Sequence, residues 1–292
     1  MNLTNFGLDS IALAGPLASK LAACRAAGFS QIMLWARDLV EHPGGIEDAV
    51  RLVRQSGLRV TGIQVLRDYE GLDNGLHEYK LDIARHLLRV CKAVGAGILV
   101  VGSSTSSHAS GEYERIARDL AKLANSAVPL GVRIGYEALS WGRHVQSWEQ
   151  AWEVVDMAAH ANVGVVLDSF HMLAGGDELE GLEDMPSEKI ALVQLSDFMW
   201  RDLRSLDERI ETAGHLRVFP GEGCHSAELS SILRRLDRGG YRGSYSLEVV
   251  NDDYLQLPPD IVCARALMAA KWITDQVLRR SLQVRAYAGR TL

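Results

Sequence analysis

Four polar side chains in the second half of the chain end or interrupt segments that are otherwise apolar. They are Glu137, Asp168, Gln194 and Glu248. A buried carboxylate without a partner costs several kcal/mol or becomes neutral, and three converging acids repel one another. A divalent cation removes this repulsion. Because every donor atom is an oxygen, Mg²⁺ or Mn²⁺ fits better than a structural zinc site, which prefers Cys and His. The alternative is that each acid pairs with an arginine or caps a helix.

A histidine, His171, lies three residues after Asp168. Its unperturbed pKa of about 6.5 suits a general acid or base near neutral pH. The sequence therefore predicts His171 as the catalytic group. The alternative is a histidine that only holds a neighbouring residue by a hydrogen bond.

Basic residues follow several of the apolar segments and could bind a small anionic substrate. They are Arg67, Arg143, His144 and Arg217. The planar guanidinium of arginine matches a carboxylate in two parallel hydrogen bonds. For any one of these arginines, a solvated surface position or an ion pair is the alternative.

Eight short apolar segments must position these side chains. They lack strict alternation of apolar and polar residues, which is typical of parallel strands covered on both faces. The predicted strands are Leu8–Leu13, Gln31–Trp35, Arg59–Leu66, Gly97–Val101, Arg133–Glu137, Val163–Asp168, Ala191–Ser196 and Ser244–Val249.

Amphipathic segments of helical period lie between these strands, and several end at a glycine. The segment that begins at Ser147 has Gln150 three residues later, a capping box. The predicted helices are Pro16–Ala27, Ile46–Ser56, Tyr79–Val94, Tyr113–Val128, Ser147–Ala161, Ser226–Arg238 and Pro259–Leu278, with one more inside Met172–Lys189.

Eight strands that alternate with helices predict an α/β fold, a (β/α)8 TIM barrel, with residues 1–292 as a single domain. The rival is a doubly wound sheet, whose glycine-rich G-x-G-x-x-G motif is absent from the sequence. In a barrel the active site lies at the carboxyl ends of the strands, where the four oxygen ligands stand.

Composition narrows the function classes. The 292 residues carry 31 basic and 37 acidic side chains, a net charge of −6, which gives no support to nucleic-acid binding. No apolar run approaches the roughly 20 residues of a membrane span, and no basic residue precedes Lys20, so we expect no membrane partner, no secretory signal and a cytoplasmic protein. The four cysteines are far apart and predict reduced thiols. The sequence leaves a homo-oligomer open.

Five segments in chain order resemble a known family. They are RDYEG (67–71), YEALSWGRHV (136–145), VGVVLDSFHML (163–173), RVFPGEG (217–223) and SLEVVND (246–252). The quartet of oxygen ligands resembles the xylose-isomerase-like TIM-barrel superfamily, and the five segments resemble its bacterial 3-dehydroshikimate dehydratases. Each segment alone is weak, whereas the ordered set extends over about the whole chain.

The resemblance implies the dehydration of 3-dehydroshikimate to protocatechuate through a metal-stabilised enolate. It implies one divalent cation (Mg²⁺ or Mn²⁺, with Co²⁺ as a further candidate) on Glu137, Asp168, Gln194 and Glu248. His171 matches the acid/base histidine of the family. Arg67 and Arg217 match substrate-binding arginines, and the pair Arg143 and His144 also resembles the dehydratases.

Two positions depart from the family pattern. Its usual glutamate on the second strand is absent from residues 32–38, and its Ser-Arg-His before the FPG motif is replaced by Ala213, Gly214 and His215. Both departures bear on the substrate more than on the metal. The alternatives are a metal-dependent sugar or keto-acid isomerase or epimerase of the same superfamily, a DNA-repair nuclease, which the missing histidines disfavour, and a non-catalytic sugar-binding barrel.

Overall fold

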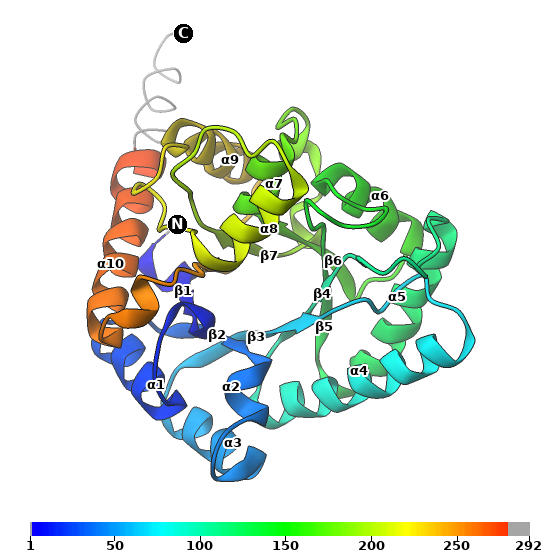
Figure 1. The fold of residues 1–292 in the computed structure, drawn as a ribbon, viewed down its shortest axis with the longest axis horizontal. Coiled ribbons are helices and arrows are strands. Elements are labelled where there is room, and N and C mark those ends of the chain that lie inside the picture. The colour runs from blue at the N-terminus through cyan, green and yellow to red at the C-terminus, as the bar shows by residue number, and fades with distance from the viewer. Residues whose placement is uncertain (1, 280–292) are drawn as a thin grey trace, which may run out of the picture.

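The computed structural model describes residues 2–279. Its centre is a closed barrel of parallel strands that pair in chain order, with the first strand beside the eighth (Figure 1). The strands are β1 Phe6–Asp9, β2 Gln31–Trp35, β3 Arg59–Leu66, β4 Ile98–Gly102, β5 Arg133–Glu137, β6 Val163–Asp168, β7 Ile190–Leu195 and β8 Tyr245–Leu247. This confirms the predicted (β/α)8 barrel.

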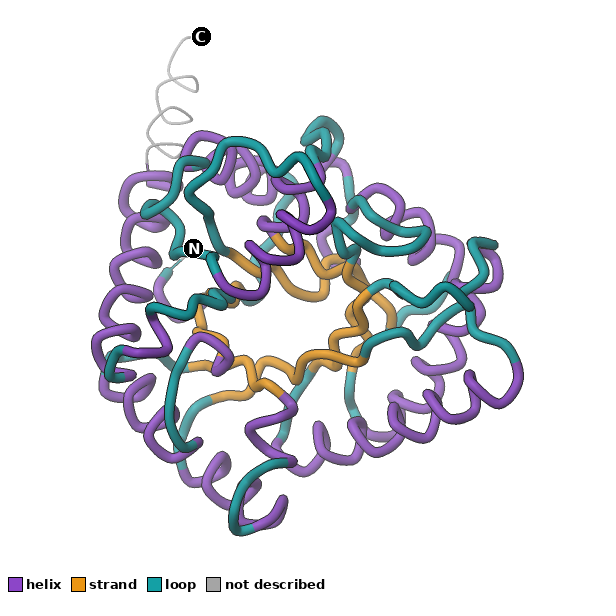
Figure 2. Tube along the Cα trace, in the orientation of Figure 1, coloured by secondary structure: helices purple, strands orange, loops and turns teal. Residues whose placement is uncertain are grey.

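Helices surround the ring of strands (Figure 2). They are α1 Leu17–Ala26, α2 Ala36–Val40, α3 Gly45–Gln55, α4 Asn74–Val94, α5 Tyr113–Ala127, α6 Trp148–Ala158, α7 Ser169–Gly175, α8 Leu206–His215, α9 Ser226–Arg238 and α10 Pro259–Trp272, which continues as a π-helical segment over Ile273–Leu278. The predicted capping box at the start of α6 is present, because the Ser147 side chain accepts from the backbone N–H of Gln150.

The first strand differs from its prediction. β1 covers residues 6–9 and not Leu8–Leu13, because residues 10–12 turn into a short 3₁₀ helix. The Asp9 side chain caps this turn by accepting the backbone N–H of Ile11 at 2.9 Å. Asp9 therefore stands at the carboxyl end of a strand, which is the catalytic end of a barrel.

Several helices differ from the predictions, and among them α4 begins at Asn74 and not at Tyr79. The helix expected inside Met172–Lys189 begins earlier, at Ser169, because Asp168 caps it through the backbone N–H of Phe170. Two helices were not predicted, α2 and α8. The second of these begins at a capping box formed by Ser205 and Glu208.

Alternate residues of each strand pack on opposite faces of the barrel wall. In β4, Ile98 and Val100 join a small apolar cluster drawn from several strands, which fills the inside of the barrel. Leu99 and Val101 join the large cluster between strands and helices. The same alternation decides which polar side chains face the inside at the carboxyl ends of the strands.

No helix within residues 2–279 combines the length and the apolar character that a membrane crossing needs. All four cysteines are free thiols, as predicted.

Candidate active site

Strand alternation turns the four predicted metal ligands into the barrel. Leu167 packs in the outer cluster, so the next residue, Asp168, faces the inside. The same rule turns the other three predicted ligands inward: Glu137, Gln194 and Glu248. All four side chains are buried.

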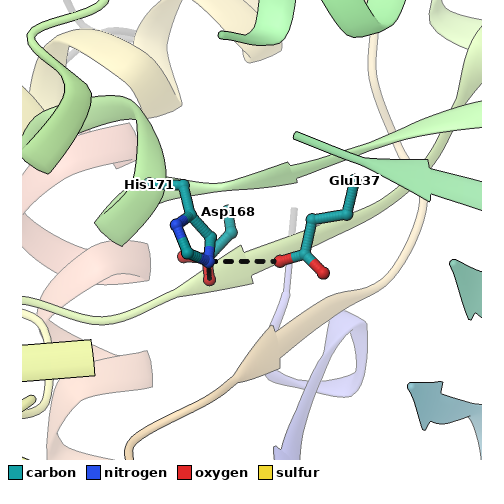
Figure 3. Close-up of side chains that lie close together, drawn as sticks. All are labelled: Glu137, Asp168 and His171. Carbon is teal, nitrogen blue, oxygen red and sulfur yellow. Dashed lines mark ion pairs between the residues drawn. The ribbon is translucent and has the colours of Figure 1, made fainter. Parts of the chain in front are cut away.

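Glu137, Asp168 and His171 offer donor atoms that lie within 4.8 Å of one another. The His171 Nε2 atom is 3.8 Å from Glu137 Oε1 and also 3.8 Å from Asp168 Oδ2. Figure 3 shows the imidazole directed at the two carboxylates. Two acids and an imidazole are thus within reach of one small ligand.

Arg217 connects this cluster to the remaining predicted ligands. Its Nη1 atom lies 2.8 Å from Asp168 Oδ2 and 3.7 Å from Glu248 Oε2. Glu248 Oε2 in turn accepts a hydrogen bond of 2.6 Å from Gln194 Nε2. The structure therefore brings all four predicted ligands together. Asp168 also shows both of the alternatives to metal binding, because it pairs with Arg217 and caps the helix that begins at Ser169.

Two side chains of the cluster, Glu137 and Gln194, have oxygen atoms that accept no hydrogen bond from the described residues. The Glu137 carboxylate is only 4% exposed and accepts no hydrogen bond from residues 2–279. Gln194 Oε1 is buried and equally unpaired within that range. Asp168 uses both oxygens, but a carboxylate has about four lone-pair sites and can take a cation in addition. This set of oxygen donors fits a divalent cation.

Burial raises the pKa of two acids of the cluster, Glu137 and Glu248. Burial, followed by repulsion from Glu248 and Asp168, raises the pKa of Glu137 well above its usual value. Burial also raises the pKa of Glu248 to about 7, although the Arg217 guanidinium opposes this shift. A cation that holds these carboxylates ionised would therefore replace protons as it binds.

His171 is neutral in this environment. Burial lowers its pKa to about 3, and the attraction of Asp168 only partly offsets the effect. The backbone N–H of Ser140 donates to Nδ1 at 3.1 Å, and Ser140 Oγ lies 3.2 Å from the same atom. Because the Ser140 N–H donates to Nδ1, Nδ1 is an acceptor and the proton of the neutral ring lies on Nε2.

A cavity of about 510 Å³ opens above the cluster, a size typical of small-molecule sites. Glu137, His171, Arg217 and Glu248 line it, whereas Asp168 and Gln194 do not. Aromatic and aliphatic side chains make up much of the remaining wall, and they include Trp35, Trp141, Ile210 and Leu255. The Trp141 ring meets the His171 ring edge-on at 4.7 Å between centroids.

The predicted substrate-binding residues separate into two groups. Arg67 and Arg217 line the cavity. Arg143 is exposed and His144 bonds through Nε2 to the backbone oxygen of Ala109, and neither lines the cavity. The role of Arg143 and His144 in substrate binding stays a prediction.

Three polar residues at the mouth were not found from the sequence. Asp9 was hidden because the predicted end of the first strand, Leu13, lies four residues beyond the end in the structure. Gln64 lies inside an apolar strand, as Gln194 does, and the same signal could have found it. Lys20 gives no signal in the sequence, although it is 4% exposed, lines the cavity and pairs with Asp38 at 2.7 Å.

Comparison with known proteins gives the following relationships. Residues 21–272 match the family model described as xylose isomerase-like TIM barrel. A 3-dehydroshikimate dehydratase of Pseudomonas aeruginosa is 39% identical over 251 residues, which cover 86% of this chain and 39% of the relative. An inosose isomerase of Bacillus subtilis is 28% identical over 218 residues, 73% of this chain and 72% of the relative.

A solved structure extends this likeness. It is a fusion of a xylose isomerase-like TIM barrel with a 4-hydroxyphenylpyruvate dioxygenase, superposes with a TM-score of 0.89 and is 31% identical. The match covers 97% of this chain and 45% of the fusion protein. The chain thus spans less than half the length of the dehydratase and of the fusion protein.

Proposed function

Because the chain belongs to the xylose isomerase-like TIM barrel family, we propose that it is a metal-dependent lyase that converts 3-dehydroshikimate to protocatechuate and water. The observation that carries the proposal is the buried set of oxygen donors beside a buried histidine, with two arginines in the same cavity wall. The 39% identity to a 3-dehydroshikimate dehydratase supports this choice of substrate.

Glu137, Asp168, Gln194 and Glu248 would hold the cation, with Mg²⁺ or Mn²⁺ expected and Co²⁺ as a further candidate. A bound divalent cation supplies Lewis-acid stabilisation of the negative charge that develops at a carbonyl oxygen when a neighbouring carbon loses a proton.

His171 would move that proton. Its neutral ring would accept the proton at Nε2 in the tautomer with the other ring proton on Nδ1. In that tautomer the bond from the Ser140 N–H to Nδ1 gives way to one from Nδ1–H to Ser140 Oγ. The imidazolium formed would be stabilised by the carboxylates of Glu137 and Asp168, each 3.8 Å from Nε2. Return of the proton to the departing hydroxyl releases water, and enolisation of the ring then gives the aromatic product.

Arg67 and Arg217 would bind the carboxylate of the substrate. The Arg67 side chain makes no hydrogen bond or ion pair with residues 2–279, so its donors are free. Arg217 gives Nη1 to Asp168 and Nε to the backbone oxygen of Ala213, which leaves Nη2 without a partner in the described part of the chain. Two guanidinium groups with free donors suit a small anion.

The test is incubation of the purified protein with 3-dehydroshikimate and Mg²⁺, Mn²⁺ or Co²⁺ while the ultraviolet absorbance of the aromatic product is followed. We expect absorbance to grow with at least one metal and to stop when a chelator is added. If none of the three metals gives aromatic product at high substrate concentration, the dehydratase proposal is wrong.

A metal-dependent isomerase is the second candidate, and the relationship to an inosose isomerase favours it. Such a reaction also begins with removal of a proton beside a carbonyl group, so the same cluster would serve. Conversion of inosose by the protein, without aromatic product from 3-dehydroshikimate, would identify this second function.

A further inference from the structure

A row of hydrogen-bonded side chains crosses the mouth of the barrel from β1 to the end of β8. Gln64 Nε2 donates to Asp9 Oδ2 at 2.6 Å. Gln194 Nε2 donates to Gln64 Oε1 at 3.2 Å and to Glu248 Oε2 at 2.6 Å. Asp9, Gln64 and Gln194 are at most 3% exposed, so no bulk water competes for these bonds.

The direction of each bond is set at Asp9. Its Oδ1 accepts from the backbone N–H of Ile11, and its Oδ2 accepts from Gln64. With Asp9 ionised, both of its oxygens act only as acceptors, so the Gln64 amide turns its nitrogen toward Asp9 and its oxygen toward Gln194. A reversed Gln64 amide would place two oxygens 2.6 Å apart, which is repulsive.

The same logic orients Gln194. An amide nitrogen has two hydrogens, and Gln194 donates one to Gln64 Oε1 and the other to Glu248 Oε2. Its Oε1 atom is left as a buried acceptor with no partner within residues 2–279. An amide oxygen is a good ligand for a hard cation, and an amide nitrogen is not.

We propose that Asp9 and Gln64 are positioning residues that present Gln194 Oε1 to the divalent cation. Neither residue binds the cation itself: Asp9 acts on Gln64, and Gln64 acts on Gln194. This inference rests on the metal site of the proposed function but not on the identity of the substrate.

Asp9→Asn is the sharpest variant because it keeps the shape and changes one acceptor into a donor. The new amide must keep its oxygen toward the N–H of Ile11, so its NH₂ group faces Gln64. Gln64 then reverses and presents its NH₂ group to the NH₂ group of Gln194. Gln194 must reverse in turn, which brings its Oε1 to the side of Gln64 and Glu248 and away from the cation. Gln64→Met breaks the row at the next position with a side chain of similar length.

A matched control is Gln31→Met. Gln31 is also fully buried and hydrogen-bonded, but it lies at the opposite end of the barrel, at the start of β2.

The measurement is Mn²⁺ affinity by titration calorimetry, with the electron paramagnetic resonance spectrum of bound Mn²⁺ as a second readout. Loss of an outer-shell partner typically weakens metal binding 10–100-fold, so we expect about that loss for Asp9→Asn and for Gln64→Met. Gln31→Met should bind Mn²⁺ as wild type does, with any cost confined to thermal stability. The double variant Asp9→Asn with Gln64→Met should bind no more weakly than Gln64→Met alone, because Asp9 acts through Gln64.

Wild-type affinity in Asp9→Asn, or additive losses in the double variant, would overturn the inference. Because Gln64→Met tests the row at a second position, poor folding of one variant does not remove the test. If the wild type binds no Mn²⁺, the proposed metal site and this inference are both wrong. If it binds Mn²⁺ but forms no aromatic product, only the substrate assignment falls.

Discussion

At the scale of single residues, His171 combines a buried, neutral imidazole with two carboxylates 3.8 Å away. Its Nδ1 atom is already occupied by Ser140, so the ring presents only Nε2 to a ligand in the cavity. This geometry suits proton transfer, and it makes the role of His171 separable from metal binding by experiment.

We expect His171→Ala to lower kcat about 10²–10⁴-fold, the usual loss when a general base is removed. Metal content, measured by elemental analysis, should stay the same. His86→Ala is a suitable control because His86 is exposed on α4. Loss of the metal in His171→Ala would instead identify His171 as a ligand.

Glu70 is a buried acid that makes the stability of the folded protein depend on pH. Its Oε1 atom accepts from the Ser104 backbone at 2.6 Å and from the Tyr136 hydroxyl at 3.1 Å. Burial nevertheless raises its pKa from 4.5 to about 7. Because the folded-state pKa is the higher one, this contribution is full below about pH 4.5 and is lost as the pH rises through 7.

Glu70→Gln imitates the protonated carboxyl and should therefore change stability only at higher pH. We expect equal unfolding free energies for the variant and the wild type near pH 5. At pH 8 the variant should be more stable by up to about 3 kcal/mol, the equivalent of a shift of about two to three pKa units. Urea unfolding at both pH values measures the difference, and a difference that does not vary with pH would contradict this account.

At the scale of elements, α8 brings the family departures into the cavity wall. Ile210, Ala213 and Gly214 all line the cavity, and a Cβ atom added at Gly214 would have no neighbour within 4 Å. The helix therefore has open space for a larger side chain at Gly214.

The double change Ala213→Ser with Gly214→Arg should strengthen binding of an anionic substrate. A charge-assisted hydrogen bond is worth roughly 1.5–3 kcal/mol, so we expect KM for 3-dehydroshikimate to fall about tenfold or more. Steady-state kinetics of both proteins measure this. An unchanged or higher KM would show that the natural substrate carries less negative charge.

The strands were more predictable from the sequence than the loop helices. A buried parallel strand is recognised in the sequence as a short apolar segment. The bounds of β5 and β6 agree with the prediction for this reason. β1 was placed late because Ile11, Ala12 and Leu13 are apolar although the strand has already ended at Asp9, which caps the turn that follows. α8 was missed although its Ser205–Glu208 capping box is visible in the sequence. The pairing of Arg217 with Asp168 joins residues 49 positions apart, which no local pattern encodes.

At the scale of the whole molecule, the proposed cation would link β5 through β8 at one end of the barrel. A ligand that binds only the folded state stabilises it by about 2.7 kcal/mol at a concentration 100 times its Kd. We expect Tm, measured by calorimetry, to rise with Mg²⁺, Mn²⁺ or Co²⁺ and to fall when a chelator is added. A Tm that does not respond to any of the three metals would count against the site.

The alternation of inward and outward side chains also limits how such a protein can change over evolutionary time. Inserting or deleting one residue within β6 would turn Asp168 toward the helices and Leu167 toward the cavity. Within a strand, substitutions are therefore tolerated, whereas the insertion or deletion of a single residue is not. We therefore expect length variation among relatives in the connections beyond the strand ends, such as the segment that carries α8, where new substrate preferences can arise while the ligand set stays in register.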